Sequence, residues 1–213
     1  MVIQECHDYF DLLIDKIESA YFTDEEKDIL ITQACIEYVK KFLPSAENPG
    51  ANLELDQINY NNLYSLIYST GSTSMSTTGV ITMSAVQALL NTASGSTDPF
   101  MAILGLGWTK SSQSYPVKWT KNNNWLSYLG NSFKKGSATA PRYKHDKTNF
   151  TFYPIDVNAA ISFTLLKQPK ATSLAGGVTI ELPEHTHKSI IELAVDLAAT
   201  SLREPELKGL NRE

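Results

Sequence analysis

Cysteine is scarce in this chain, with only Cys6 and Cys35 among 213 residues. Both lie in segments with a helical pattern. A framework of disulfides, which small secreted domains use in place of a large core, is therefore excluded as the organising device. Free cysteine is among the most often buried side chains, so we predict that both thiols are free and buried.

Long apolar runs are also missing. No segment reaches the roughly 18 uninterrupted apolar residues that a membrane-spanning helix needs, and residues 1–10 lack the cationic stretch and apolar run of a secretory signal. We therefore expect no contact with a membrane, and synthesis and retention in the cytoplasm of the producing cell.

Charge is sparse and leans to the acidic side. Charged residues make up 19% of the chain, and the net charge is −5. A protein whose affinity depends on neutralising phosphates clusters Lys and Arg on one face. The balance argues against a direct nucleic-acid binder, although it leaves a local basic strip open.

Motifs for common chemistries are absent. The Gly-Leu-Gly at residues 105–107 lacks both the third glycine of a dinucleotide fingerprint and the Lys-Ser/Thr of a phosphate loop, and no Gly-x-Ser-x-Gly occurs. Acidic residues such as Asp11, Asp24 and Asp28 could serve a hydrolase with paired carboxylates. No apolar pocket residues lie between them, so we interpret them as a solvated face. We expect no enzyme activity and no cofactor.

Amphipathic helices are predicted at both ends. Apolar residues recur at three- and four-residue steps over residues 4–20 and 24–42. Thr23 with Glu26 matches a capping box at the start of the second helix. Further helices are predicted over residues 56–68 and 183–202, and the broad apolar stripe of the last one needs a partner surface.

The middle of the chain has a different composition. Residues 69–78 are almost wholly Ser, Thr and Gly, which is typical of an exposed loop. Short runs of strand-forming residues follow, separated by Gly, Asn and Pro. The runs lie at residues 80–83, 101–104, 116–120, 149–153 and 160–166.

These patterns predict an α+β fold. Residues 1–70 and 182–213 would form a helical bundle with a C-terminal tail, because the last helix finds its partner surface on the first three. Residues 71–181 would form an inserted β-rich domain that carries the Ser/Thr-rich loop.

Two histidines are weak candidates for a metal site. His185 and His187, with Glu184, offer ligand types that a transition metal accepts. Residues two apart on a helix point in different directions, so the imidazoles would converge only if the helix began after them. The alternative places Glu184 at the positive end of the helix dipole and the histidines on a surface or interface. We predict no metal site.

An aromatic cluster is the other candidate for binding. Trp108, Trp119, Trp125 and Tyr128 could form a platform for a carbohydrate or a partner protein. A β domain normally uses such residues in its core as well, and the core is the favoured interpretation.

Three segments, two near the chain ends and one central, together resemble a known family. They are YFDLLIDKIES at residues 9–19 with EKD at 26–28 and Ala34; LGNSFKKG at 129–136 with APR at 140–142 and the run 149–154; and residues 167–202, with KQP at 167–169 and LPE at 182–184. In combination they are similar to adaptor (ring) proteins of the head-to-tail connector of short-tailed bacteriophages, most of all the crAss-like group.

The resemblance implies a virion structural protein: a twelve-subunit adaptor ring that joins the capsid portal to the tail and forms part of the DNA channel. Its partners would be the portal protein, other ring or tail proteins and copies of itself. Genomic DNA would pass through without sequence-specific binding, and we expect acidic channel walls that let it slide. The ring would assemble in the host bacterial cytoplasm and lie in the head-tail connector of the virion.

The segment after Leu202 is short and charged, and we predict that it reaches a neighbouring subunit or the portal. The candidate interface residues are Arg203, Glu204, Pro205, Glu206, Leu207 and Lys208. Three other interpretations stay open: another tail or ring component, a virion-associated hydrolase with a metal at His185 and His187, and a virion-associated carbohydrate-binding module that uses the tryptophans.

Overall fold

The computed structural model describes residues 1–15, 22–43 and 57–210, without the side chains of Ile58 and residues 202–210. The fold is α+β, as predicted. The chain divides into two compact units. The helical unit contains Met1–Leu66 and Gln168–Glu213, and the β unit contains Ile67–Lys167.

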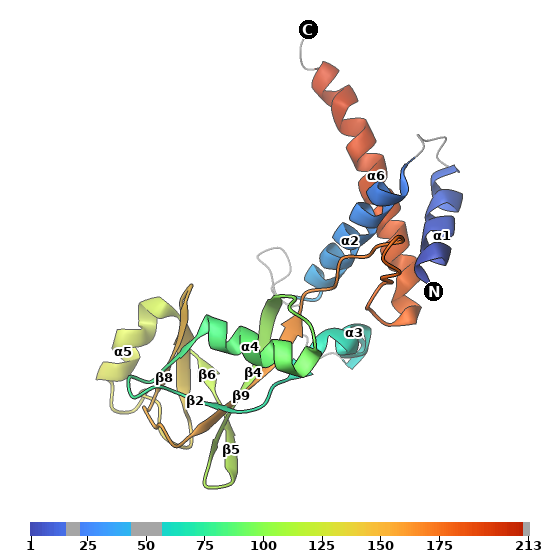
Figure 1. Ribbon diagram of the computed structural model, residues 1–213. Helices are drawn as coiled ribbons and strands as arrows, with labels where there is room; N and C mark the ends of the chain where they lie inside the picture. The colour runs from blue at the N-terminus through green and yellow to red at the C-terminus, as the bar shows by residue number, and fades with distance from the viewer. Residues whose placement is uncertain (16–21, 44–56, 211–213) are drawn as a thin grey trace. The chain divides into compact units, whose positions relative to one another are not determined.

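Three long helices form the helical unit. They are α1 (Ile3–Asp15), α2 (Asp24–Lys40) and α6 (His187–Leu210), and α6 packs against both of the others (Figure 1). The unit also has a short α-helix, α3 (Gln57–Leu63), and two single-turn 3-10 helices, η1 (Tyr64–Leu66) and η3 (Glu184–Thr186). The core residues include Phe10, Ile14, Ile31, Ala34, Val39, Ile190, Ile191, Ala194 and Ala198. None of the helices in the described part of the chain has the length and apolar character needed to cross a membrane.

The start of α2 and the two cysteines follow the sequence prediction. The Glu26 N–H donates to Thr23 Oγ1 at 3.3 Å, and the Thr23 N–H donates to Glu26 Oε2 at 2.8 Å, which completes the capping box. The Glu26 carboxylate accepts hydrogen bonds from the Thr23 N–H and the Thr23 hydroxyl, and these lower the pKa of Glu26. Cys6 and Cys35 are free and buried, and burial raises the pKa of Cys35 to about 12.

Two sheets form the β unit. The first has the order β1 (Ile67–Ser69), β9 (Ala160–Lys167), β4 (Phe100–Lys110), β5 (Gln113–Pro116), and β2 (Thr73–Ser74) also pairs with β9. The second has the order β3 (Val80–Thr82), β8 (Asn149–Tyr153), β7 (Arg142–His145), β6 (Lys118–Trp119). Strands β6 and β7 run parallel, and the other pairs are antiparallel. The helices of this unit are α4 (Met83–Ser94), η2 (Asn122–Asn124) and α5 (Trp125–Gly130).

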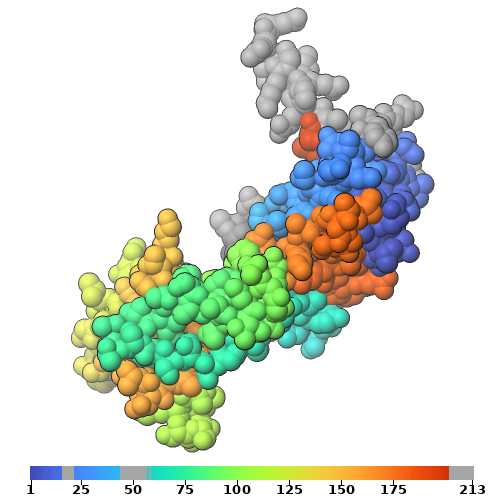
Figure 2. Space-filling model, viewed as in Figure 1, coloured from blue at the N-terminus to red at the C-terminus, as the bar shows by residue number. Residues whose placement is uncertain are grey.

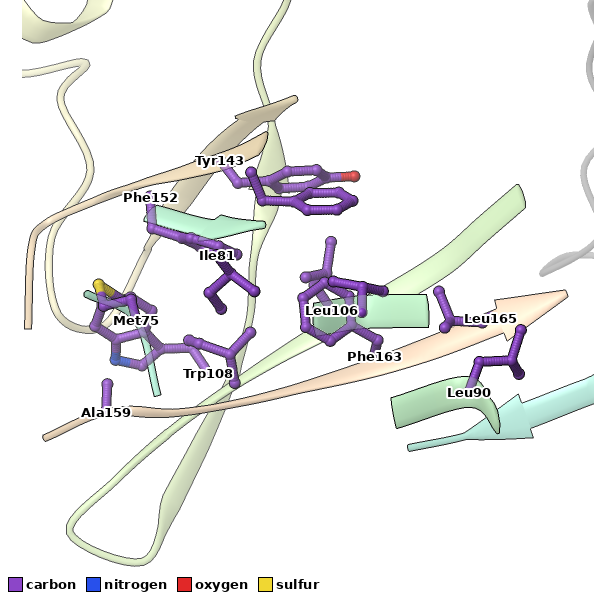
Figure 3. Close-up of a cluster of buried hydrophobic side chains, with 13 residues drawn as sticks. Met75, Ile81, Leu90, Leu106, Trp108, Tyr143, Phe152, Ala159, Phe163 and Leu165 are labelled. Atoms are coloured by element: carbon purple, nitrogen blue, oxygen red, sulfur yellow. The ribbon is translucent and has the colours of Figure 1, made fainter. Parts of the chain in front are cut away.

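The core of the β unit lies where side chains from the two sheets and α4 meet (Figure 3). Alternate residues of β9, including Phe163 and Leu165, are buried, as the two-residue period of a strand requires. The Phe163 ring packs edge-on against Phe150 of β8, with 5.5 Å between centroids. Leu90 of α4 is fully buried in the same cluster.

The sequence prediction was wrong at several elements. The third helix ends at Leu63 instead of residue 68, because Ile67–Ser69 pair with β9 as strand β1. Residues 69–78 are not wholly an exposed loop, since they contain β2 and the buried Met75. Helices α4 and α5 and strand β7 were not predicted.

The boundaries of the two units also differ from those expected at residues 70/71 and 181/182. The segment 168–181 belongs to the helical unit. Its backbone is tied to α2: the Thr172 N–H donates to Thr32 Oγ1 at 3.0 Å, and the Leu174 N–H donates to Asp28 Oδ2 at 2.9 Å. In Figure 2 the orange atoms of this segment lie against the blue atoms of α1 and α2.

Two glycines with left-handed backbones provide a test of packing in the β unit. Gly79 has φ +75°, and a Cβ there would lie 2.8 Å from Ile155 Cγ1 and 3.1 Å from the Phe152 carbonyl oxygen. Gly95 has φ +65° and open space around the same position. We predict that Gly79→Ala lowers the free energy of unfolding by roughly 2 to 4 kcal/mol, through strain plus overpacking.

The matched variant Gly95→Ala carries only the conformational strain, about 1 kcal/mol. Urea denaturation followed by tryptophan fluorescence measures both, because Trp108, Trp119 and Trp125 all belong to the β unit. Equal losses for the two variants would contradict the packing argument.

Candidate functional site

A pocket of about 450 Å³ opens on the β unit, a volume in the usual range of ligand pockets. Its lining comes from the start of α4, the first half of β4, and strands β6 and β7. The lining residues are Met83, Phe100, Met101, Ala102, Ile103, Trp119, Tyr143 and His145. Most of these side chains are apolar or aromatic, so the pocket suits an apolar group or a ring.

The pairing register of β6 and β7 brings three aromatic side chains together on one side of this pocket. Trp119 of β6 pairs with Tyr143 of β7, and His145 lies two residues further on the same face. The His145 ring is 6.2 Å from the Trp119 ring and 6.4 Å from the Tyr143 ring, between centroids. Trp119 is 53% exposed, and burial raises the pKa of Tyr143.

The structure separates the aromatic residues that the sequence grouped together. Trp108 is fully buried in the core of the β unit, and Trp125 is 7% exposed. The core interpretation is therefore right for these two and wrong for Trp119. Trp119, Trp125 and Tyr128 do not form one platform, because Trp119 lines the pocket while the other two lie on α5, over the opposite face of the sheet.

Basic side chains gather on that opposite face and in the loops beside it. Lys118 of β6 is in register with Arg142 of β7, and Lys144 follows two residues later on the same side. The Arg142 guanidinium lies 4.4 Å from the centre of the Tyr128 ring, and Lys144 Nζ lies 5.7 Å from that of Trp125. We use the name basic face for these three basic residues together with the exposed lysines of the loops that adjoin β6 and β7 in the sequence; it comprises Lys118, Lys121, Lys134, Lys135, Arg142, Lys144 and Lys147.

Sequence reasoning missed the basic face because it considered charge over the whole chain. The signal was present in a shorter window: residues 118–147 contain seven basic residues and one acidic residue, Asp146. Hydrogen bonds from the Thr148 and Asn149 backbone lower the pKa of Asp146, and the charge of Lys144 lowers it further.

A buried polar cluster joins three segments of the helical unit. The His7 side chain is 1% exposed, and its Nε2 lies 2.9 Å from Asp28 Oδ1. The Asp28 carboxylate also accepts the Leu174 N–H. Beside it, Lys27 Nζ lies 2.7 Å from Asp11 Oδ2. Burial lowers the pKa of Lys27, but its ion pairs with Asp11 and Asp24 raise it more, and the net direction is upward.

This cluster has the partners of a structural contact. The His7 imidazole is enclosed, so a substrate cannot reach it in this conformation. Asp28 was interpreted as part of a solvated face, and the structure corrects this, because its side chain is 15% exposed and holds His7 and the Leu174 backbone. The signal for His7 lay in the helical period, since residues 3, 6, 7, 10 and 14 share the buried side of α1.

We predict that Asp28→Ala lowers the free energy of unfolding by roughly 2 to 4 kcal/mol. The change leaves the His7 ring and the Leu174 N–H buried without their acceptor, and each unpaired group costs about 1 to 3 kcal/mol. Urea denaturation followed by helical circular dichroism measures the loss. The control is Gln33→Ala at an exposed position of α2, where the change should stay within about 0.5 kcal/mol. A loss below about 1 kcal/mol for Asp28→Ala would contradict the role assigned to this carboxylate.

His185 and His187 have different partners. His185 Nε2 lies 2.9 Å from Asn62 Oδ1 and its side chain is exposed, whereas His187 is buried and its Nε2 donates to the Leu182 carbonyl at 2.7 Å. The helix α6 begins at His187, after a turn of η3. Among the residues that the structure describes, no group of three or more His, Cys, Asp and Glu side chains is placed to hold a metal ion.

His187 makes stability depend on pH. Burial lowers its pKa below the ordinary value, which is about 6.5, so the unfolded chain binds a proton before the folded chain does. The stability is fully present above about pH 6.5 and declines as the pH falls below that value towards the folded pKa. We predict that His187→Gln reduces the slope of unfolding free energy against pH between about pH 5 and 7, by up to about 1.4 kcal/mol per pH unit.

Urea denaturation at several pH values measures this slope. Lys188→Gln, at the exposed next position of α6, leaves the His187 imidazole in place and should leave the slope unchanged. An identical slope for His187→Gln and the unaltered protein would show that His187 does not cause it.

The candidate interface residues of the C-terminal segment lie on a helix rather than in an irregular tail. Helix α6 continues beyond the buried Ala198 through Pro205 to Leu210. Arg203, Glu204, Pro205, Glu206, Leu207 and Lys208 are all part of it. At 1.5 Å per residue, residues 199–210 extend the helix by about 18 Å.

Comparisons with known proteins do not identify a family. No protein-family model matches the chain, and no curated protein sequence matches it.

Proposed function

We propose that this protein is a virion structural protein, an adaptor ring subunit that joins the capsid portal to the tail. One observation carries the proposal: the two ends of the chain fold together as one helical unit, and a β unit is inserted between them. This is the architecture implied by the resemblance to head-to-tail connector adaptors. Location in the virion and the DNA channel are parts of the same proposal.

The contacts within the helical unit are those expected of a ring subunit that keeps its conformation when force is applied to it. Asp28 ties α1, α2 and the segment before α6 together through His7 and Leu174. These groups are far apart in the sequence but share one buried carboxylate. A ring that passes strain from one subunit to the next needs such a rigid platform.

Helix α6 supplies a docking element. It runs about three further turns beyond the buried Ala198. Recognition of a helix by a groove in a partner is a common mode of protein binding. We assign residues 203–208 to contact with the portal or a neighbouring subunit.

The exposed apolar side chains fit a subunit that is covered by neighbours. Ile29 of α2 is 68% exposed, and Leu126 and Phe133 of the β unit are 79% and 100% exposed. Ring subunits repeat one heterologous contact until the rotation closes. Each subunit then presents different surfaces to its two neighbours, which accounts for apolar groups on both units.

Native mass spectrometry tests the proposal with the full chain and the portal protein encoded in the same genome. We expect twelve copies bound per portal ring. Leu207→Asp places a charge in the docking helix and should weaken portal binding by at least about tenfold, the loss of one good interface contact. Ala93→Asp adds the same charge at an exposed position of α4 and should bind normally.

Failure of the chain to bind the portal at any concentration would overturn the adaptor assignment. Binding with unchanged affinity for Leu207→Asp would leave the adaptor but remove α6 as its docking element. The carbohydrate-binding alternative has weaker support. Only one of the three tryptophans, Trp119, is substantially exposed, and the pocket that it lines is mostly apolar.

A further inference from the structure

The charges of this protein are divided between its two units. The β unit has nine basic and three acidic residues, a formal charge of +6. The helical unit has nine basic and 20 acidic residues, a formal charge of −11. The net value of −5 is therefore the sum of two opposite charges and describes neither unit.

The excess positive charge of the β unit lies on the basic face. Its two other basic residues are paired, Lys110 with Asp156 and Lys167 with Asp98 at 3.3 Å. The third acidic residue, Asp146, is held by the backbone N–H groups of Thr148 and Asn149. None of the seven side chains of the basic face forms an ion pair with a carboxylate within the part of the chain that the structure describes.

The geometry of this face suits an extended polyanion. Lys118 and Arg142 lie side by side on β6 and β7, and Arg142 and Lys144 are fixed over the α5 aromatics. The remaining lysines are exposed in the loops around them. A group of seven cations with a single carboxylate, Asp146, among them is an arrangement by which proteins follow a phosphate backbone.

One exposed aromatic side chain accompanies the cations. Phe133, directly before Lys134 and Lys135, is 100% exposed. Aromatic faces beside Lys and Arg bind the bases of nucleic acids by stacking.

The alternative ligand for the basic face is the acidic helical unit of a second copy of this chain, and the structure disfavours that alternative. Many of its described carboxylates are already engaged within the unit. Asp11 and Asp24 lie close to Lys27, Asp28 holds His7 and Leu174, and Glu37 pairs with Lys40. Less of the negative charge is free to attract a neighbour than the sequence count suggests.

We propose that the basic face of the β unit binds the phosphodiester backbone of DNA without sequence preference. The assignment of DNA as the polymer rests on the proposed function, in which genomic DNA passes this subunit. The polyanion specificity itself rests on the charges and aromatic groups of the β unit and requires no ring.

Fluorescence anisotropy of the full chain tests this with two labelled probes, a 20-nucleotide oligo(dT) and a 20-base-pair duplex of arbitrary sequence. We expect micromolar binding near 0.1 M salt, weakening with a log–log salt slope of about −4 to −6 for the duplex, since each phosphate contact contributes about −0.9. Stronger binding of oligo(dT) would show that stacking on Phe133 contributes to affinity. Stronger binding of the duplex would show that contacts with the phosphate backbone are sufficient.

The deciding variant is Lys118→Gln/Lys121→Gln/Lys134→Gln/Lys135→Gln, which changes exposed lysines and leaves Arg142 and Lys144 in place. It should reduce the magnitude of the slope by about 3 to 4 and weaken duplex binding by at least about 100-fold near 0.1 M salt. Lys170→Gln/Lys188→Gln removes exposed lysines of the helical unit and should reduce the slope by less than about 1.

Equal loss of binding in both variants would overturn the assignment of a site on the β unit. The DNA assignment would also be overturned if the full chain did not bind DNA but associated with itself in a salt-sensitive way that the quadruple variant abolished. The basic face would then bind a second copy of the chain. Portal binding is measured separately, so that the two proposals can fail independently. If the chain binds the portal but not DNA, only the DNA-binding inference is wrong. If it binds DNA but not the portal, only the adaptor proposal is wrong.

Discussion

The carboxylate of Asp28 is the contact on which the helical unit depends. It accepts hydrogen bonds from the backbone of Leu174 and lies 2.9 Å from His7 Nε2, so one side chain of α2 fixes both α1 and the segment that leads to α6. The whole β unit separates α1 and α2 from the segment before α6 in the sequence, and bringing them together costs chain entropy. A buried carboxylate without partners would be expensive, so the pairing forms only when all three segments are in place. The same contact therefore makes assembly of the unit cooperative.

The β unit is organised differently, by strand pairing and alternation. Strand β9 pairs with β1, β2 and β4, and its alternate side chains, including Phe163 and Leu165, carry the core (Figure 3). The second sheet buries Phe150 and Phe152 on one side. Its other side, at β6 and β7, carries charges and α5. Period-2 alternation thus separates an apolar interior and a pocket from a basic exterior on the same strands.

Local signals in the sequence predicted where helices begin. They did not predict strand pairings between segments that are distant in the sequence. Thr23 and Glu26 predicted the capping box of α2, because both partners lie within one turn. The start and end of α4 had equally local signals, Thr82 as N-cap and Gly95 with φ +65° as C-cap, but the strand-like residues before it obscured them. The end of α3 could not be predicted this way, because pairing of Ile67–Ser69 with distant β9 overrides the helical pattern. His7 shows the limit of reading residue types alone: its position on the apolar side of α1 indicated burial, but its partner Asp28 is supplied by the fold.

Net charge was the least informative quantity in the sequence, for a physical reason. Electrostatic attraction in solution acts over a Debye length of about 8 Å at physiological salt, which is far smaller than a unit of 100 residues. Within the β unit, a ligand at the basic face therefore responds to the local seven cations and one carboxylate more than to the net charge of the whole chain. The expectation of acidic channel walls stays a prediction: the charge of −11 on the helical unit has the sign that it requires, and the charge of +6 on the β unit has the opposite sign. If both units border a DNA path, the chain would combine a surface that repels the polymer with one that holds it, and the ionic strength would set which effect dominates.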